Sequence, residues 1–236
     1  MDYSSTHLSV ITRSKTVRLN SGILKFLTRL RSDAALPWQN KARLNHYNHT
    51  LKRIEAMTDA ISVPANISFE QAIALTETLM AQMQQQQLTE PALEATLAAL
   101  VSSENGARGF FVTYLTDERS LADHPSDAVI RALQSSPEIV SELLVKNLAM
   151  SSAMAIAHRR NQNEEMAQGS DRVQTRTAQL IERLKLPEVT DKAQKLHASA
   201  ATGTGDYQAF LDRWGYDAEQ RKVIQQTMER VLGAEP

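Results

Sequence analysis

The sequence predicts an all-α protein, built as an irregular bundle of about ten helices. Its 236 residues include 56 Ala and Leu but only 23 Val and Ile, and 17 Gln add further helix-tolerant positions. Unbranched side chains lose little rotamer freedom in a helix, whereas β-branched ones lose more. Gly and Pro, with 8 and 7 residues, are scarce, which favours long elements with few turns. We find no convincing alternation of apolar and polar residues typical of strands.

Capping residues and helix breakers set the expected order of elements in the first half of the chain. Ser68 and Thr89 are expected to cap helices as the residues just before them, and Pro91 suits a first turn. The expected helical segments are 20–32, 37–61, 68–87, a helix from 89, 106–117 and 126–134.

The second half of the chain is expected to contain one long helix near residues 137–168. Pro137 suits its first turn, and Gly169 with Ser170 is expected to interrupt it before a further helix to Leu186. Shorter pieces follow, separated by a turn at 203–206, with Asp206 and Asp217 as expected N-caps and Gly233 as a C-terminal cap.

The domain organisation expected is a disordered terminus of residues 1–7 and a single all-α domain over residues 8–236. The chain has no Cys, which excludes disulfides and thiol chemistry. No apolar run reaches the length of a membrane helix, since the closest, 148–157, contains two serines. The N-terminus has no apolar stretch of a secretory signal, so we expect a soluble, cytoplasmic protein.

Charge is distributed unevenly along the chain, although its net value is only −1. Residues 1–53 carry a net charge of +8, and the basic part of the domain, residues 8–53, lies within them. Residues 54–130 carry a net charge of −9, and residues 131–236 have a net charge of zero. Either the basic segment packs against the acidic segment of the same chain, or it faces an anionic partner. The sequence favours the first interpretation and leaves the second open.

The helix expected from Pro37 presents a cationic surface that suits an anionic partner such as nucleic acid. Its apolar stripe leaves amides and cations on the other side, because residues three and four apart share a face. Lysine and arginine neutralise phosphates. The candidate binding residues are Arg43, Lys41, Lys52, Arg53, His49 and Trp38. His46 and His49 also share a face, but the surrounding cations disfavour a metal, so no metal site is predicted.

The face of the long helix changes character along its length. Its first half is bulky and apolar, whereas the stretch 149–157 is almost entirely Ala, Ser and Met. Small residues either permit close helix packing or leave room for a ligand. Close packing with a buried, hydrogen-bonded histidine is the structural interpretation. The alternative is a pocket around His158, lined by Ser151, Asn147, Gln162 and Glu165.

Two glycines precede an aromatic cluster in the middle of the chain. Gly106 and Gly109 lie three residues apart, and Phe110 and Tyr114 share a helix face. This pattern favours a tight crossing of two helices with the rings as core anchors, over a hinge that moves an aromatic lid.

No catalytic or cofactor motif is evident, and so no catalytic residue is named. The leading hypothesis is a non-enzymatic helical binding or regulatory protein that acts through protein–protein contacts. The first alternative is a nucleic-acid-associated regulator that uses residues 13–53. The second is a small-molecule or cofactor-binding protein centred on His158, and an enzyme is not excluded.

Overall fold

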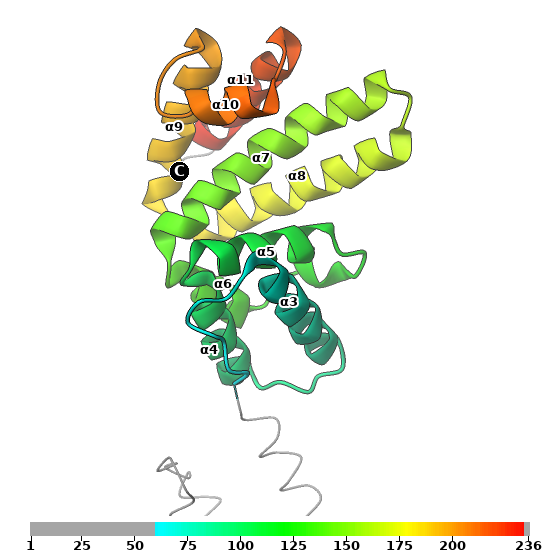
Figure 1. The fold of residues 1–236 in the computed structure, drawn as a ribbon, viewed down its shortest axis with the longest axis vertical. Coiled ribbons are helices and arrows are strands. Elements are labelled where there is room, and N and C mark those ends of the chain that lie inside the picture. The colour runs from blue at the N-terminus through cyan, green and yellow to red at the C-terminus, as the bar shows by residue number, and fades with distance from the viewer. Residues whose placement is uncertain (1–59, 234–236) are drawn as a thin grey trace, which may run out of the picture. The chain divides into compact units, whose positions relative to one another are not determined.

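The computed structural model describes residues 60–233, and every regular element in that range is helical (Figure 1). This confirms the all-α fold class. The chain divides into two units, 1–53 and 54–236, and only the second contains described residues. The prediction of a single domain over 8–236 therefore stays a prediction, and the expected helices before residue 60 and the disordered 1–7 lie outside the described residues.

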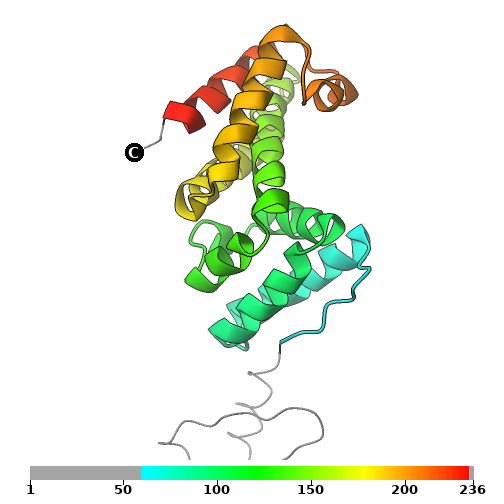
Figure 2. The same ribbon diagram turned by 90° about the vertical axis from the view of Figure 1, so that its left-hand side faces the viewer.

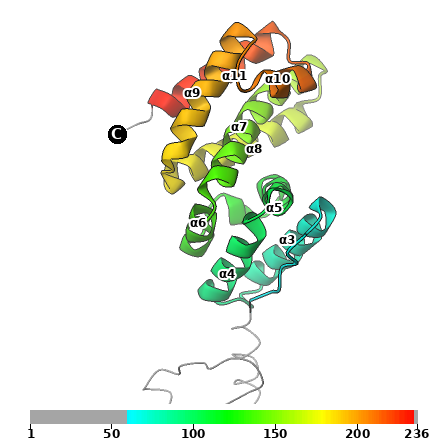
Figure 3. The ribbon, with the colours of Figure 1, turned by 60° about the vertical axis from the view of Figure 1, so that its left-hand side comes forward.

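The elements in order are α3 (Phe69–Gln84), α4 (Glu90–Val101), α5 (Glu104–Thr116), the short 3-10 helix η1 (Ser120–Ala122), α6 (Asp127–Gln134), α7 (Pro137–Arg160), α8 (Glu164–Leu184), α9 (Pro187–Thr202), α10 (Gln208–Trp214) and α11 (Ala218–Gly233). Within the described range, α3 to α6 gather on one side of α7 and α8, and α9 to α11 on the other (Figures 1 and 3).

Most of the expected caps are confirmed. Ser68 and Gln71 form a reciprocal capping box before α3, and the Thr89 hydroxyl accepts from the Ala92 amide before α4. Asp217 accepts from the Gln220 amide at 2.9 Å as α11 begins. The prediction for Asp206 is wrong, because α10 begins two residues later and has Tyr207 at its N-cap.

The long helix α7 ends at Arg160, earlier than the expected residue 168. Asn161 closes the helix, Gln162 adopts a left-handed φ of 57°, and the Asn163 side chain caps α8 by accepting from the Met166 amide. Gly169 lies inside α8 and does not interrupt it. The turn between α7 and α8 therefore lies before Gly169, because the cap at Asn163 sets the start of α8. An isolated glycine such as Gly169 is tolerated within a helix.

The crossing of α3 and α5 confirms that the glycines permit close packing. A Cβ at Gly109 would lie 2.4 Å from the Ala72 Cβ of α3. A Cβ at Gly106 would lie 1.9 Å from the Leu100 carbonyl oxygen, so Gly106 permits the close approach of α5 to the end of α4. The adjacent rings are core anchors: Phe110, Phe111 and Tyr114 are buried, and Phe110 stacks on Tyr114 with centroids 4.8 Å apart.

Two hydrophobic clusters form the core of residues 60–233, and α7 contributes to both. Val140 and Leu144 join the cluster built with α3 to α6, whereas Leu148, Ala149 and Ala153 join the cluster built with α9 to α11. Figure 2 shows α9 packed along α7. By length and hydropathy alone α7 could cross a membrane, but 56% of its most apolar window is buried inside the fold. That burial is typical of a core helix.

Candidate functional site

The predicted anionic-partner residues fall in the first unit of the chain. Lys41, Arg43, His49, Lys52, Arg53 and Trp38 all lie outside the described residues. Their role in binding stays a prediction.

The acidic segment that follows is neutralised in part by arginines of its own fold. Over residues 60–130 the chain carries nine acidic side chains but only Arg108 and Arg119 as basic ones. Ion pairs join Glu94 to Arg131, Asp117 to Arg119, Asp123 to Arg176 and Asp127 to Arg183. Three of these four arginines come from α6 and α8, so these two helices pair with three of the nine acidic side chains.

Arg176 is the most deeply buried charged group in the described structure, with 1% of its surface exposed. Its Nε and Nη2 donate to the Asp123 carboxylate at 2.6 and 3.0 Å. Nη1 donates to the carbonyls of Leu115 and Asp117, and Nη2 to that of Arg119. The hydrogen bond from Arg176 lowers the pKa of Asp123. The guanidinium thus fixes the segment that joins α5 to α6.

The five residues of the predicted His158 pocket are placed differently from one another. Ser151 is buried, and its hydroxyl donates to the Leu148 carbonyl of the same helix at 3.1 Å. Asn147 and His158 are half-buried, whereas Gln162 and Glu165 are exposed and lie beyond the end of α7. The small residues Ser151, Ser152 and Ala155 are buried, on a helix that packs against α8, α9 and α11. Ligand binding at His158 stays a prediction.

A depression of about 510 Å³ lies elsewhere on the described surface, where α8 meets the turn before α6. Its lining carries both signs of charge and comprises Asp123, His124, Pro125, Gln179, Glu182, Arg183 and Lys185. Arg183 is already engaged there, since it donates to the Pro125 carbonyl and to Asp127. Among residues 60–233 no group of three potential metal ligands comes together.

The contact of α10 with α7 brings together charged and aromatic side chains. Tyr207 donates its hydroxyl to Glu142 at 2.8 Å, and Lys146 and Lys192 pair with the same carboxylate. The Lys146 ammonium lies 5.6 Å from the Phe210 ring centroid, which is cation–π distance. Burial alone would raise the pKa of Glu142, but the hydrogen bonds from Lys146 and Tyr207 outweigh it and lower that pKa.

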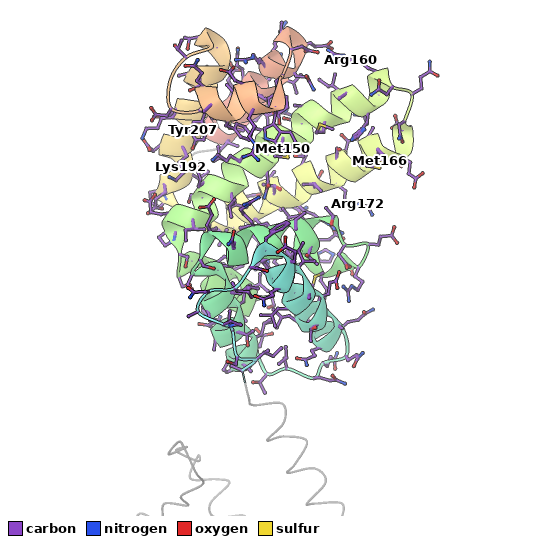
Figure 4. All side chains as sticks on the ribbon, in the orientation of Figure 1. Met150, Arg160, Met166, Arg172, Lys192 and Tyr207 are labelled. Carbon is purple, nitrogen blue, oxygen red and sulfur yellow. The ribbon has the colours of Figure 1, made fainter. Side chains whose placement is uncertain are left out.

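Beyond this contact, further apolar side chains lie at helical spacing from Phe210 on α10 and from Lys146 on α7. Trp214 follows Phe210 by about one turn and is 49% exposed. Met150 follows Lys146 by about one turn on α7 (Figure 4) and is half-buried. Met154, one turn further, is also half-buried. We call the set Lys146, Met150, Met154, Phe210 and Trp214 the α7–α10 face. Its members are two aromatic rings, two adaptable thioethers and the cation that lies over Phe210.

Sequence reasoning missed both of these clusters. Arg176 could have been found, because it falls at helical spacing between Val173 and Leu180, on the apolar stripe of α8. A charged residue on such a stripe must find buried partners. The contact of Tyr207 with Glu142 carried no comparable pattern, since these two residues are 65 residues apart.

Comparisons with known proteins give one family. No curated protein and no solved structure matches the chain. A family model described as "Uncharacterised conserved protein UCP020893" matches residues 68–231, which run from the N-cap of α3 to the last turn of α11. Because this match spans well over half of the sequence, the chain belongs to that family.

Proposed function

We propose that the protein is a non-enzymatic, cytoplasmic binding protein that engages a protein partner through its helical body. The observation that carries the proposal is Trp214 at the end of α10, which is 49% exposed, together with the half-buried methionines Met150 and Met154 of α7. Tryptophan dominates the energy of many protein interfaces, and methionine adapts to varied partner surfaces. Exposed apolar patches on a folded body mark such contact sites.

Site-specific photo-crosslinking in the native host tests this proposal. A photoreactive amino acid at position 214 is expected to give a discrete, saturable adduct with one protein. The same group at Gln226, an exposed position of α11, is the matched control. Met150→Glu should abolish the adduct from position 214, because it places a charge within the apolar surface. Adducts of equal yield from both positions, or adducts that survive Met150→Glu, would contradict the proposal.

A second candidate function is binding of an anionic partner, with nucleic acid as the example, by the basic residues before position 54. The pairing of acidic residues with Arg131, Arg176 and Arg183 favours it. Acidic side chains that are already paired contribute less negative charge for binding the basic segment of the same chain. This supports binding of that segment to an external anionic partner.

Fluorescence polarisation with random-sequence DNA and RNA tests this second candidate. Binding should be strongest at about 50 mM salt and weaken steeply as salt rises, because each neutralised phosphate releases counterions. Replacing Lys41, Arg43, Lys52 and Arg53 by Ala should weaken binding without lowering the thermal midpoint of residues 60–233. Absence of binding at low salt would eliminate the candidate.

A further inference from the structure

The first turn of α5 contains the dipeptide Asn105–Gly106. Asn105 is exposed, and its side-chain amide has no hydrogen-bond partner within residues 60–233. An asparagine that precedes glycine is especially prone to deamidation, because glycine has no side chain to hinder ring closure. The main-chain nitrogen of Gly106 attacks the side-chain carbonyl carbon of Asn105, ammonia leaves, and a succinimide forms. Water then opens this ring to aspartate or isoaspartate, so the reaction needs no other reagent.

The folded start of α5 holds these atoms in an arrangement that opposes ring closure. In a helix ψ is about −42°, and this angle turns the Gly106 nitrogen away from the side-chain carbon of Asn105. The Gly106 N–H also donates to the hydroxyl of Ser103, the N-cap residue of α5, at 3.2 Å. Both restraints must be released before the nitrogen can attack. The reaction therefore requires local opening of the start of α5.

Packing requires the glycine that makes Asn105 reactive. Gly106 is buried, and a Cβ there would lie 1.9 Å from the Leu100 carbonyl oxygen, so a larger residue does not fit. Isoaspartate routes the main chain through the former side-chain carbon, which adds one methylene unit directly before this contact. Because α5 also carries three buried aromatic rings, a shift at its start would disturb the core.

We infer that Asn105 is a modification site, where spontaneous deamidation converts the folded chain to a destabilised isoaspartate form at a rate set by opening of the α5 start. The aspartate product is tolerated, because a carboxylate in the first turn of a helix is favourable. Asn161, exposed at the end of α7, reacts more slowly, since the side chain of Gln162 hinders ring closure. The Ser103 cap thus protects the chain from this modification.

Peptide mapping by mass spectrometry, after incubation of the full chain in mildly alkaline buffer, tests the proposal. Isoaspartate should accumulate at position 105 faster than at Asn161. Ser103→Ala removes the acceptor of the Gly106 N–H and should accelerate the reaction about fivefold. Ser103→Asp keeps a capping oxygen and should react at the wild-type rate. Asn105→Gln is the matched control and should stay intact, because glutamine must close a larger ring.

The consequence for the fold is measured on the isoaspartate form, isolated by ion exchange. Its thermal midpoint should lie below that of wild type, whereas Asn105→Asp, which adds the same charge without extending the main chain, should keep the wild-type midpoint.

Three results would overturn the proposal. One is equal rates in wild type and Ser103→Ala, and another is no product at position 105 in folded Ser103→Ala while the urea-unfolded chain converts. The third is an isoaspartate form as stable as Asn105→Asp. Circular dichroism verifies folding, and Ser103→Gly, which also lacks the acceptor, replaces Ser103→Ala if that variant does not fold.

Discussion

One short connection joins α5 to α6, and another, residues 203–217, here called the strap, joins α9 to α11. Both pack against long helices, but the first is held by a buried charge and the second by buried rings and surface ion pairs. Arg176, with 1% of its surface exposed, donates five hydrogen bonds to residues 115–123. The Tyr114 hydroxyl adds a sixth, to the Leu121 carbonyl. The strap is held by the buried side chains of Tyr207, Leu211 and Tyr216 and by polar contacts nearer the surface. These are the hydrogen bond from Tyr207 to Glu142 and the ion pairs of Asp206 with Lys195 and of Asp217 with Arg160.

This difference suggests a division of roles within one helical body. A buried charge with many partners stabilises one geometry strongly, because any movement strands the charge. A connection whose polar contacts are half-exposed can open without leaving a buried charge unpaired. The α5–α6 connection therefore acts as fixed scaffold, and the strap is the part of the described chain that is suited to change.

The largest expected effect is the loss of the buried guanidinium. Arg176→Ala should destabilise the protein by about 3–5 kcal/mol, because three backbone carbonyls and Asp123 lose their donor. The thermal midpoint should fall by roughly 10 °C, measured by calorimetry. Arg172→Ala, one turn earlier and exposed, is the matched control and should change stability by less than about 0.5 kcal/mol. Similar losses for both variants would contradict the scaffold role of Arg176.

Two glycine substitutions should change stability in opposite directions. Gly109→Ala forces a methyl group to within 2.4 Å of the Ala72 Cβ and should cost about 1–3 kcal/mol. Gly169→Ala in α8 meets nothing within 4 Å and should stabilise the protein by up to about 1 kcal/mol, since alanine favours the helix. Urea unfolding measures both changes. Stabilisation by Gly109→Ala would refute the tight crossing of α3 and α5.

Removing one hydroxyl should weaken the strap in a pH-dependent way. Tyr207→Phe removes the hydrogen bond to Glu142 and should cost about 1 kcal/mol at neutral pH. The folded pKa of Glu142 lies below its ordinary value of 4.5, so its carboxylate contributes stability above that pH, and the contribution is lost as the pH falls through the folded pKa. The gap between wild type and Tyr207→Phe should therefore shrink below about pH 4.5 in denaturant melts at stepped pH. A gap that widens in acid would contradict this assignment.

The smallest expected effect is at His158. Its ring is half-buried near the end of α7, so His158→Ala should cost less than about 1 kcal/mol. Thermal melts of the variant beside Arg176→Ala provide the comparison. A loss as large as that of Arg176→Ala would show that a buried histidine network stabilises the end of α7.

The fold was largely predictable from sequence, because its determinants are local. Ser68, Thr89 and Pro137 set helix starts through contacts within one turn. The two glycines, Gly106 and Gly109, just before the large rings of Phe110 and Tyr114 predicted the helix crossing, which the structure shows at Gly109. The predicted end of α7 is wrong, because the sequence pattern favours Gly169 as the helix break, whereas the N-cap at Asn163 starts α8 earlier.

The candidate site was not predictable in the same way. The partners of Arg176 lie 53 to 61 residues away, and Tyr207 meets Glu142 across 65 residues. Neither pairing repeats at a helical period, so a single sequence cannot specify which partner each side chain finds. The small residues 149–157 were correctly considered for close packing, because that property depends on side-chain size alone.

Native-state hydrogen exchange of the full chain, resolved by mass spectrometry, tests the contrast between the two connections most directly. The account predicts that amides of residues 207–214 exchange at least about tenfold faster than those of α9, with residues 115–123 as slow as their neighbouring helices. Loosening the strap with Tyr207→Phe should accelerate only residues 203–217. Exchange of residues 207–214 at the rate of α9, or faster exchange in residues 115–123 than in the strap, would contradict the account.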